Sequence, residues 1–174
     1  MTTTLIIIAI IIAVIVIVSL AIGYEMNIER NITINKPLNE VFNYLKYTRN
    51  QDNFSVWNMT DPTMNKSYVG TDATIGFIYS WDSTNKNVGA GEQEIKNILD
   101  GMEIEYELRF KRPMQNVAKS SFVFKAVSAT ETNVQWGFYS KMKFPMNIMK
   151  SMFTKMLGKD LEKSLVNLKV ILEK

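Results

Sequence analysis

The chain has 174 residues, a formal net charge of +3 at pH 7, no cysteine and no histidine. The lack of cysteine excludes disulfides, thiolate chemistry and cysteine-based metal sites. The lack of histidine removes the usual general base near neutral pH, the usual zinc ligand and every histidine-activated nucleophile. We therefore expect no metal site and no cofactor. The length suffices for one domain with a hydrophobic core and a short appendage.

The first predicted element is an apolar helix that begins at Leu5 and ends at Ile22, with Ser19 as its only polar side chain. Its length matches a hydrocarbon core of about 30 Å. A cleaved signal peptide is the alternative, but MTTT lacks basic residues and SLAIGYEM lacks a clear cleavage pattern. We therefore expect residues 1–25 to form an uncleaved, single-pass membrane anchor. Arg30 and Lys36 follow this segment, which favours a cytoplasmic domain.

Residues 26–34, MNIERNITI, alternate apolar and polar side chains and predict a strand. Pro37 marks the start of a short helix over NKPLNEVFNYLKY, which places Val41, Phe42 and Leu45 on one face. The polar stretch that follows, TRNQDNFSVWNMTDPTM, is broken by Pro62 and predicts a second short helix and then a loop.

From residue 73 to residue 142 the hydrophobic pattern has a period of two, which predicts antiparallel strands. The segment ATIGFIYSW places Ile75 and Trp81 on the same face. The segment MEIEYELRF places Met102 and Phe110 on one face and its glutamates on the other. AKSSFVFKA and TNVQWGFYSKM continue the pattern, and DSTNKN, LDG, KRPMQN and ATETN separate the runs as turns.

The motif GAGEQEI, with Gly89 and Gly91 followed by Glu92 and Glu94, has two interpretations. A phosphate-binding loop needs a third glycine and a following helix, whereas this motif is followed by a strand pattern. We therefore expect a hairpin whose glycines let the sheet bend where a side chain would obstruct it. Whether either glutamate faces the interior or the solvent stays open.

The last predicted element is a long helix that follows Pro145 and carries an apolar stripe from Met149 to Leu172. Its lysines form either a solvated face or a surface attracted to anionic lipid. No basic stripe interleaves with exposed aromatic side chains, so we expect no nucleic acid partner. The element order predicts an α+β domain in which a curved antiparallel sheet wraps around this last helix.

Five segments in this order carry a resemblance to a known family: ITINKPLNEVFNYL, WNMTDP, GTDATIGFIYSW, GAGEQEI and LGKDLEKSLVNLK. Over residues 26–174 the chain resembles the polyketide cyclase/dehydrase-like branch of the START/Bet v 1-like (SRPBCC) superfamily. The resemblance implies a helix-grip fold, in which a seven-stranded antiparallel sheet grips the C-terminal helix around an apolar cavity. Members of the superfamily bind lipids, sterols, hormones, quinones or polyketides, and a minority are catalysts without a shared catalytic residue set.

Bulky aromatic and methionine side chains are the candidate ligand contacts, because they form apolar walls and some carry a polar atom that orients a ligand. An ordinary packed core is the alternative for each of them. The candidates are Trp57, Phe77, Tyr79, Trp81, Tyr106, Trp136, Phe138, Met149, Met152 and Phe153. Glu92, Glu94 and Arg30 are candidate polar anchors, and we expect no catalytic residue.

We expect a membrane-anchored protein that binds a hydrophobic small molecule or lipid in an internal cavity without chemistry. One alternative is a cyclase- or dehydratase-like enzyme, which would depend on Glu, Asp, Tyr or Arg acid–base chemistry. The other alternative is an interaction module that regulates a membrane partner.

Overall fold

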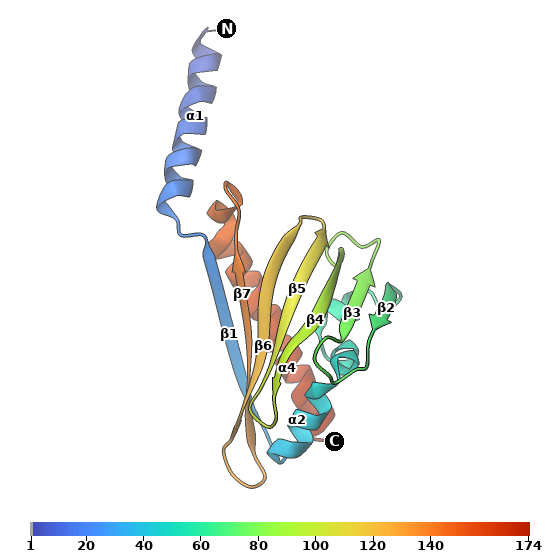
Figure 1. Ribbon diagram of the computed structural model, residues 1–174. Helices are drawn as coiled ribbons and strands as arrows, with labels where there is room; N and C mark the ends of the chain where they lie inside the picture. Colours follow the sequence, from blue (N-terminus) through green and yellow to red (C-terminus); the bar gives the residue numbers. More distant parts are fainter. Residues whose placement is uncertain (1) are drawn as a thin grey trace.

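The computed structural model describes residues 2–174, which form a seven-stranded antiparallel sheet and its helices (Figure 1). The helices are α1 (Thr2–Ala21), α2 (Leu38–Lys46), α3 (Val56–Thr60) and α4 (Lys150–Leu172), with 3₁₀ turns η1 (Thr48–Asn53) and η2 (Met146–Met149). The strands are β1 (Glu25–Ile34), β2 (Asn65–Val69), β3 (Ile78–Asp82), β4 (Ala90–Leu99), β5 (Glu103–Arg112), β6 (Asn116–Ala126) and β7 (Thr132–Lys141).

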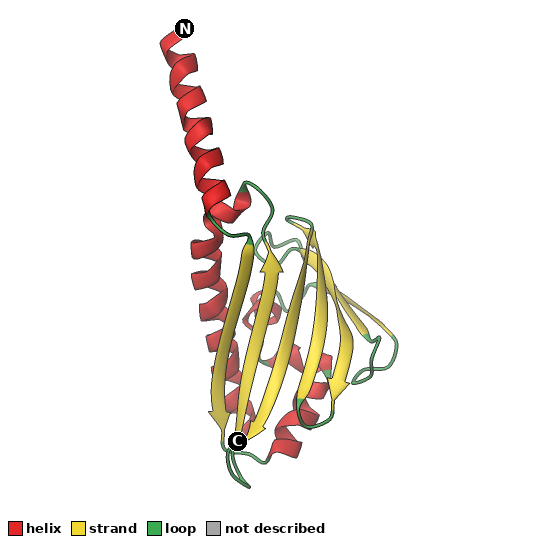
Figure 2. Ribbon diagram, turned by 60° about the vertical axis from the view of Figure 1, so that its left-hand side comes forward, coloured by secondary structure: helices red, strands yellow, loops and turns green. Residues whose placement is uncertain are grey.

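The strands lie in the order β1-β7-β6-β5-β4-β3-β2. Helix α4 and the shorter helices α2 and α3 lie on one face of this curved sheet, and the other face carries no helix in the described chain (Figure 2). The predicted arrangement, a curved antiparallel sheet around a long C-terminal helix, is confirmed.

The strand register gathers several connections at one end of the sheet, which we call the α1 end. Glu25 pairs with Lys141, Phe110 pairs with Asn116, and Ala90 pairs with Asp82. The start of β1, the end of β7, the β5–β6 turn and the β3–β4 hairpin therefore lie together. Helix α1 leaves the domain at this end, and the C-terminus lies at the opposite end (Figure 1).

The junction between α1 and the domain is held by the side chain of Asn147 in η2, which is fully buried. Its Oδ1 accepts a hydrogen bond from the Ser19 hydroxyl at 2.5 Å. Its Nδ2 donates to the backbone carbonyls of Ser19 at 2.6 Å and Ile22 at 2.9 Å. The last carbonyls of a helix have no partner within it, so Asn147 caps α1 from another part of the chain.

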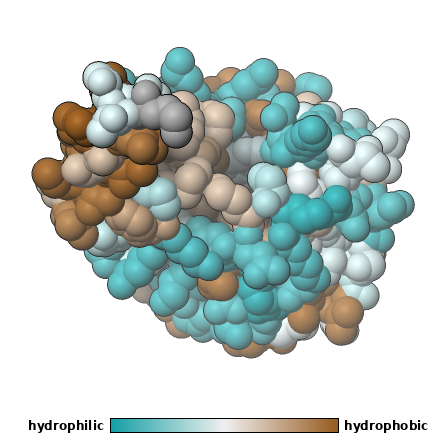
Figure 3. All heavy atoms as spheres, turned by 90° about the horizontal axis from the view of Figure 1, so that it is seen from above, coloured by the Kyte–Doolittle hydropathy of each residue, from teal (hydrophilic) through white to brown (hydrophobic). Residues whose placement is uncertain are grey.

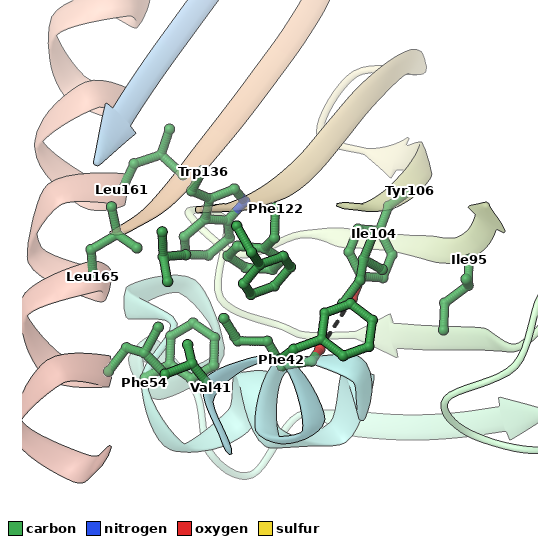
Figure 4. Close-up of a cluster of buried hydrophobic side chains, with 14 of the residues drawn as sticks. Val41, Phe42, Phe54, Ile95, Ile104, Tyr106, Phe122, Trp136, Leu161 and Leu165 are labelled. Atoms are coloured by element: carbon green, nitrogen blue, oxygen red, sulfur yellow. Dashed lines mark hydrogen bonds between the residues drawn. The ribbon is translucent and has the colours of Figure 1, made fainter. Parts of the chain in front are cut away.

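Aromatic rings fill the core beneath the centre of the sheet (Figure 4). The rings of Phe122 and Trp136 lie 4.7 Å apart between centroids, and Phe54 packs edge-on against both. From α4, Leu161 and Leu165 close this core. Fully burying one such side chain stabilises a fold by about 1.5–3 kcal/mol.

Two residues predicted to face the core with their strands are exposed instead: Ile75 is 61% exposed and Met102 is 63% exposed. Strands β3 and β5 begin only at Ile78 and Glu103. Both residues lie in tight turns: the amide of Phe77 donates to Thr74, and the amide of Met102 donates to Leu99. The alternation of apolar residues therefore continued beyond the strands, into turns where it no longer selects a face.

Strand β2 and the first turns of α4 also differ from the prediction. The sequence predicted no element at residues 65–69, where strand β2 lies, because an edge strand with mostly exposed residues lacks an alternating apolar pattern. In the predicted stripe after Pro145, Met149, Met152 and Met156 are exposed, whereas Leu161, Leu165 and Leu168 are buried. The stripe is continuous in sequence, but its fully buried residues lie in the C-terminal half of α4.

The motif GAGEQEI forms the predicted hairpin, since β3 and β4 pair directly and Gly89, with φ of +65°, ends the turn. Gly91 allows a close approach. A Cβ at this position would lie 2.7 Å from Cζ2 of Trp81 and 2.8 Å from the carbonyl oxygen of Arg109. The glycine therefore lets the Trp81 indole lie directly against the sheet.

Gly91→Ala is expected to lower the free energy of unfolding by about 1–3 kcal/mol, because the added methyl group overpacks this contact. Thermal unfolding of the full chain in detergent, followed by circular dichroism, measures the change. Gly137→Ala in β7 is the matched control, since its Cβ would find its nearest atom, the Ser121 hydroxyl, at 3.4 Å. Equal stabilities of the two variants would contradict this account of Gly91.

Candidate functional site

A cavity of about 310 Å³ lies between the concave face of the sheet and the N-terminal half of α4. Its walls are mainly apolar and aromatic, and all three tryptophans of the chain contribute to them. Leu108 and Phe110 line it from β5, and Phe153 and Leu157 line it from α4. The cavity lies beside the part of α4 where Phe153 and Leu157 are only partly buried, before the buried leucines that begin at Leu161.

The exposed lining residues show where the cavity opens. Asn87 lies in the β3–β4 hairpin, Pro113 and Met114 lie in the β5–β6 turn, and Met156 lies on α4. All four are exposed, whereas the lining residues Gln51 and Leu161 are buried. The mouth is therefore at the α1 end of the sheet, and the closed end is at η1.

The cavity brings together six of the ten predicted aromatic and methionine contacts: Trp57, Tyr79, Trp81, Trp136, Phe138 and Phe153. Phe77 and Tyr106 belong to the buried core. Met149 and Met152 lie outside the cavity, exposed at the α1 end. A role in ligand binding stays a prediction for all ten residues.

The closed end of the cavity contains two polar side chains without partners. Thr48 is 1% exposed and Gln51 is 6% exposed, and both line the cavity. Within residues 2–174, the Thr48 hydroxyl and the Gln51 side-chain nitrogen make no hydrogen bond. Both atoms are buried beside the Tyr106 hydroxyl, and leaving such a group unsatisfied costs about 1–3 kcal/mol.

The sequence analysis missed Thr48 and Gln51, because they belong to a polar segment, TRNQDN, that predicts exposed structure. The structure buries two of its side chains where η1 turns beneath the sheet. The only local signal is the position of this segment between two apolar helical faces.

Tyr79 has a hydrogen-bonded partner behind the cavity wall. Its hydroxyl donates to Asp52 at 2.8 Å, and Asn58 donates to the same carboxylate at 2.7 Å. Lys66 pairs with the other carboxylate oxygen at 2.9 Å. Burial, followed by the hydrogen bond to Asp52, raises the pKa of Tyr79 above its usual value. The phenol therefore stays neutral, with its proton directed at Asp52.

Glu92 and Glu94 lie on the outer face of the sheet, away from the cavity. Arg109 binds Glu92 at 2.6 Å and Glu94 at 2.7 Å, and it also binds Glu107 at 2.5 Å. The same alternation that directs the neighbouring Gln93 into the cavity directs these glutamates outward. The question left open by the sequence is thereby answered: both face the solvent side.

Arg30 lies on the concave side but away from the cavity. Its guanidinium packs against Gly158 of α4, where any Cβ would collide with it. Its Nη1 donates to the backbone carbonyl of Glu29 at 2.7 Å. The two candidate glutamates and Arg30 therefore do not converge on one site, and their predicted role as polar anchors has no support in this placement.

Among residues 2–174, no three carboxylate side chains are placed to hold a metal ion. Comparison with models of known protein families finds no match, and comparison with curated protein sequences finds none either.

Solved structures match the chain over most of its length. The Aha1 dimer protein from Colwellia psychrerythraea matches with a TM-score of 0.59 and 14% identity, over 85% of this chain and 96% of that one. StfQ, a di-domain ARO/CYC protein from the steffimycin biosynthetic pathway, matches with a TM-score of 0.66 and 11% identity. BexL, a di-domain ARO/CYC protein from the BE-7585A biosynthetic pathway, matches with a TM-score of 0.63 and 11% identity.

The chain spans about half the length of the two di-domain proteins. The match covers 86% of this chain and 52% of StfQ, and 87% of this chain and 51% of BexL. At these identities the similarity establishes the fold and nothing further. The predicted helix-grip fold is confirmed.

Arg109→Gln is expected to reduce the loss of thermal stability that accompanies a fall in pH. Arg109 and then Lys111 lower the pKa of Glu92, and Lys96 and then Arg109 lower the pKa of Glu94. A carboxyl group with a lowered folded-state pKa stabilises the fold above its usual pKa of about 4.3, and this contribution is lost as pH falls through the lowered value. The Arg109→Gln variant lacks part of this stabilisation at neutral pH. Its free energy of unfolding therefore decreases less than that of the wild type when the pH is lowered.

Melting temperatures measured from about pH 7 to about pH 3 test this expectation. The control is Lys125→Gln, which removes an exposed positive charge from β6 outside this cluster. Parallel pH profiles of wild type and Arg109→Gln would show that the cluster contributes nothing to acid sensitivity.

Proposed function

We propose that the chain is a membrane-anchored binding protein for a hydrophobic small molecule or lipid, and that the cavity beside α4 is its binding site. The single observation that carries the proposal is this cavity, which has apolar walls, two unpartnered polar side chains at its closed end and a mouth at the α1 end. Pockets of this size and character bind ligands with a large apolar surface and few polar atoms.

The polar side chains narrow the class of ligand. The Gln51 amide and the Thr48 hydroxyl can donate hydrogen bonds, so the ligand we propose carries an acceptor, such as a carbonyl, carboxylate or hydroxyl oxygen, at its inner end. Such a ligand removes the cost of the unsatisfied groups, whereas a pure hydrocarbon does not. The proposed ligand is therefore amphipathic and enters with its polar end first.

Helix α1 supports the anchor. It has 20 residues, no charged side chain and an apolar surface that is almost entirely exposed. This length and composition fit a membrane span and a signal sequence equally well. The bonds from Asn147 to Ser19 and Ile22 support a retained helix, because the folded domain satisfies the final carbonyls of α1.

One observation favours the enzyme alternative: Asp52 and Tyr79 form a hydrogen-bonded acid–base pair at the cavity wall. The geometry makes this pair a weak proton donor. The phenol proton already binds Asp52, and the raised pKa of Tyr79 opposes its transfer to a ligand. Asp52 is in turn occupied by Lys66 and Asn58. Binding without chemistry is therefore the better account.

Gln93→Phe is expected to weaken ligand binding at least about tenfold, because the new ring occupies the cavity and the Gln93 side chain makes no hydrogen bond within residues 2–174 that would be lost. Every tryptophan lines the cavity, so quenching of intrinsic fluorescence by a brominated fatty acid measures binding to the full chain in detergent. Gln135→Phe, on the outer face of β7, is the matched control and is expected to bind as wild type does.

The proposal fails if the wild type is not quenched, or if both variants are quenched equally. The same assay tests the polar end of the ligand. Gln51→Leu is expected to weaken binding of the brominated fatty acid and to spare a brominated alkane, because only the fatty acid presents an acceptor.

A further inference from the structure

The surface around the cavity mouth is unusually apolar for the outside of a domain. Phe144 and Met152 are each 50% exposed, and Ile148 and Met149 are exposed beside them in η2. These residues adjoin the base of α1. Viewed from above, the hydrophobic helix continues into a paler hydrophobic patch bordered by hydrophilic surface (Figure 3). We call Phe144, Ile148, Met149 and Met152 the apolar rim.

Lysines flank the apolar rim. Lys143 and Lys155 are exposed beside it and make no ion pair within residues 2–174. Lys150 donates to the backbone carbonyl of Gly23, directly after α1. The nearby carboxylates Glu25 and Asp82 are paired with Lys141 and Arg112. The surface around the mouth therefore carries excess positive charge.

The junction fixes how far this surface lies from the end of the apolar helix. Asn147 lies in η2 between the rim residues, and it bonds to the carbonyl of Ile22, the last residue of the apolar segment. A bilayer that covers the apolar surface of α1 must end close to Ile22. The rim residues are therefore held at the depth of the bilayer surface.

We propose that the apolar rim and its flanking lysines dock on the surface of the bilayer that α1 spans, so that the cavity mouth faces anionic lipid. This inference rests on the membrane anchor of the proposed function. It adds the orientation of the domain and the source from which the cavity takes its ligand. Exposed aromatic and aliphatic side chains with nearby lysines are the features that hold a surface at an anionic membrane interface.

A bilayer fits this surface better than a second protein does. The apolar rim is continuous with α1, whose exposed apolar surface requires lipid around it. A protein partner would therefore have to bind at the place where the bilayer surface already lies. Each lysine near an anionic membrane surface adds electrostatic attraction to it. The capped junction limits rotation of the domain about the end of α1, which keeps the mouth toward the lipid.

The lack of cysteine makes a direct test available, because a single introduced cysteine gives one labelling position. Met152→Cys places a nitroxide label in the apolar rim. Ser128→Cys places it in the β6–β7 turn, at the opposite end of the sheet. The full chain is reconstituted in vesicles of phosphatidylcholine with about 30% phosphatidylglycerol, which supply the anionic surface. Collisions of the label with oxygen and with a water-soluble nickel chelate are compared.

Oxygen concentrates in lipid and the chelate stays in water, so we expect oxygen collisions to exceed chelate collisions at least about threefold at position 152. The ratio is expected to reverse at position 128. Asn147→Ala in the Met152→Cys background is expected to lower the ratio at 152, with melting temperature measured to confirm that the domain is folded. Equal ratios at 152 and 128 overturn the docking, and an unchanged ratio in the Asn147 variant overturns the role of the junction.

Failure of this inference is distinguishable from failure of the proposed function. If alkaline extraction releases the chain from membranes, or if the chain is recovered without α1, then α1 is not a membrane anchor. The docking inference fails with it. Tryptophan quenching by the brominated fatty acid reports the cavity whether or not the domain contacts the membrane.

Discussion

One helix has to cover the concave face of a seven-stranded sheet, and α4 does so along only half of its length. From Leu161 to Leu168 its leucines are buried against the strands and the aromatic core. Nearer its start, the helix directs Phe153, Met156 and Leu157 toward the cavity. The cavity is therefore a direct result of how α4 packs. Its position at the α1 end follows because the less buried half of α4 lies at that end.

The same end of the domain carries the connection to α1. A serine in the last turn of an apolar helix is costly to bury unless its hydroxyl has a partner. Ser19 finds that partner in Asn147, which also binds two backbone carbonyls of the helix. A polar exception in an otherwise apolar helix thus becomes the contact that places the cavity mouth, the apolar rim and the lysines beside the end of α1.

The fold could be predicted well because the hydrophobic periodicity of each segment reports its secondary structure and the face that it buries. Alternation in MEIEYELRF and the long apolar stripe after Pro145 determine a sheet and the helix it wraps around. The same signals failed at their edges. Ile75 and Met102 continue an alternation that the backbone has already left for a turn, and Met152 continues a stripe that no longer faces a partner.

The site was harder to predict than the fold. Aromatic residues that line the cavity, such as Trp57 and Trp81, have the same pattern as aromatic residues of the packed core, such as Phe77. Periodicity identifies the face of a strand but not whether space lies in front of it. The polar end of the cavity depends on Thr48 and Gln51, which are buried by tertiary packing of η1, and no local pattern in TRNQDN reports that burial.

Native mass spectrometry of the full chain, released from lipid nanodiscs, tests the central claim most directly. The account predicts a population of the protein with one amphipathic molecule bound, and loss of that molecule when Gln93 is replaced by phenylalanine. Detection of only the ligand-free mass, in wild type and variant alike, would contradict it.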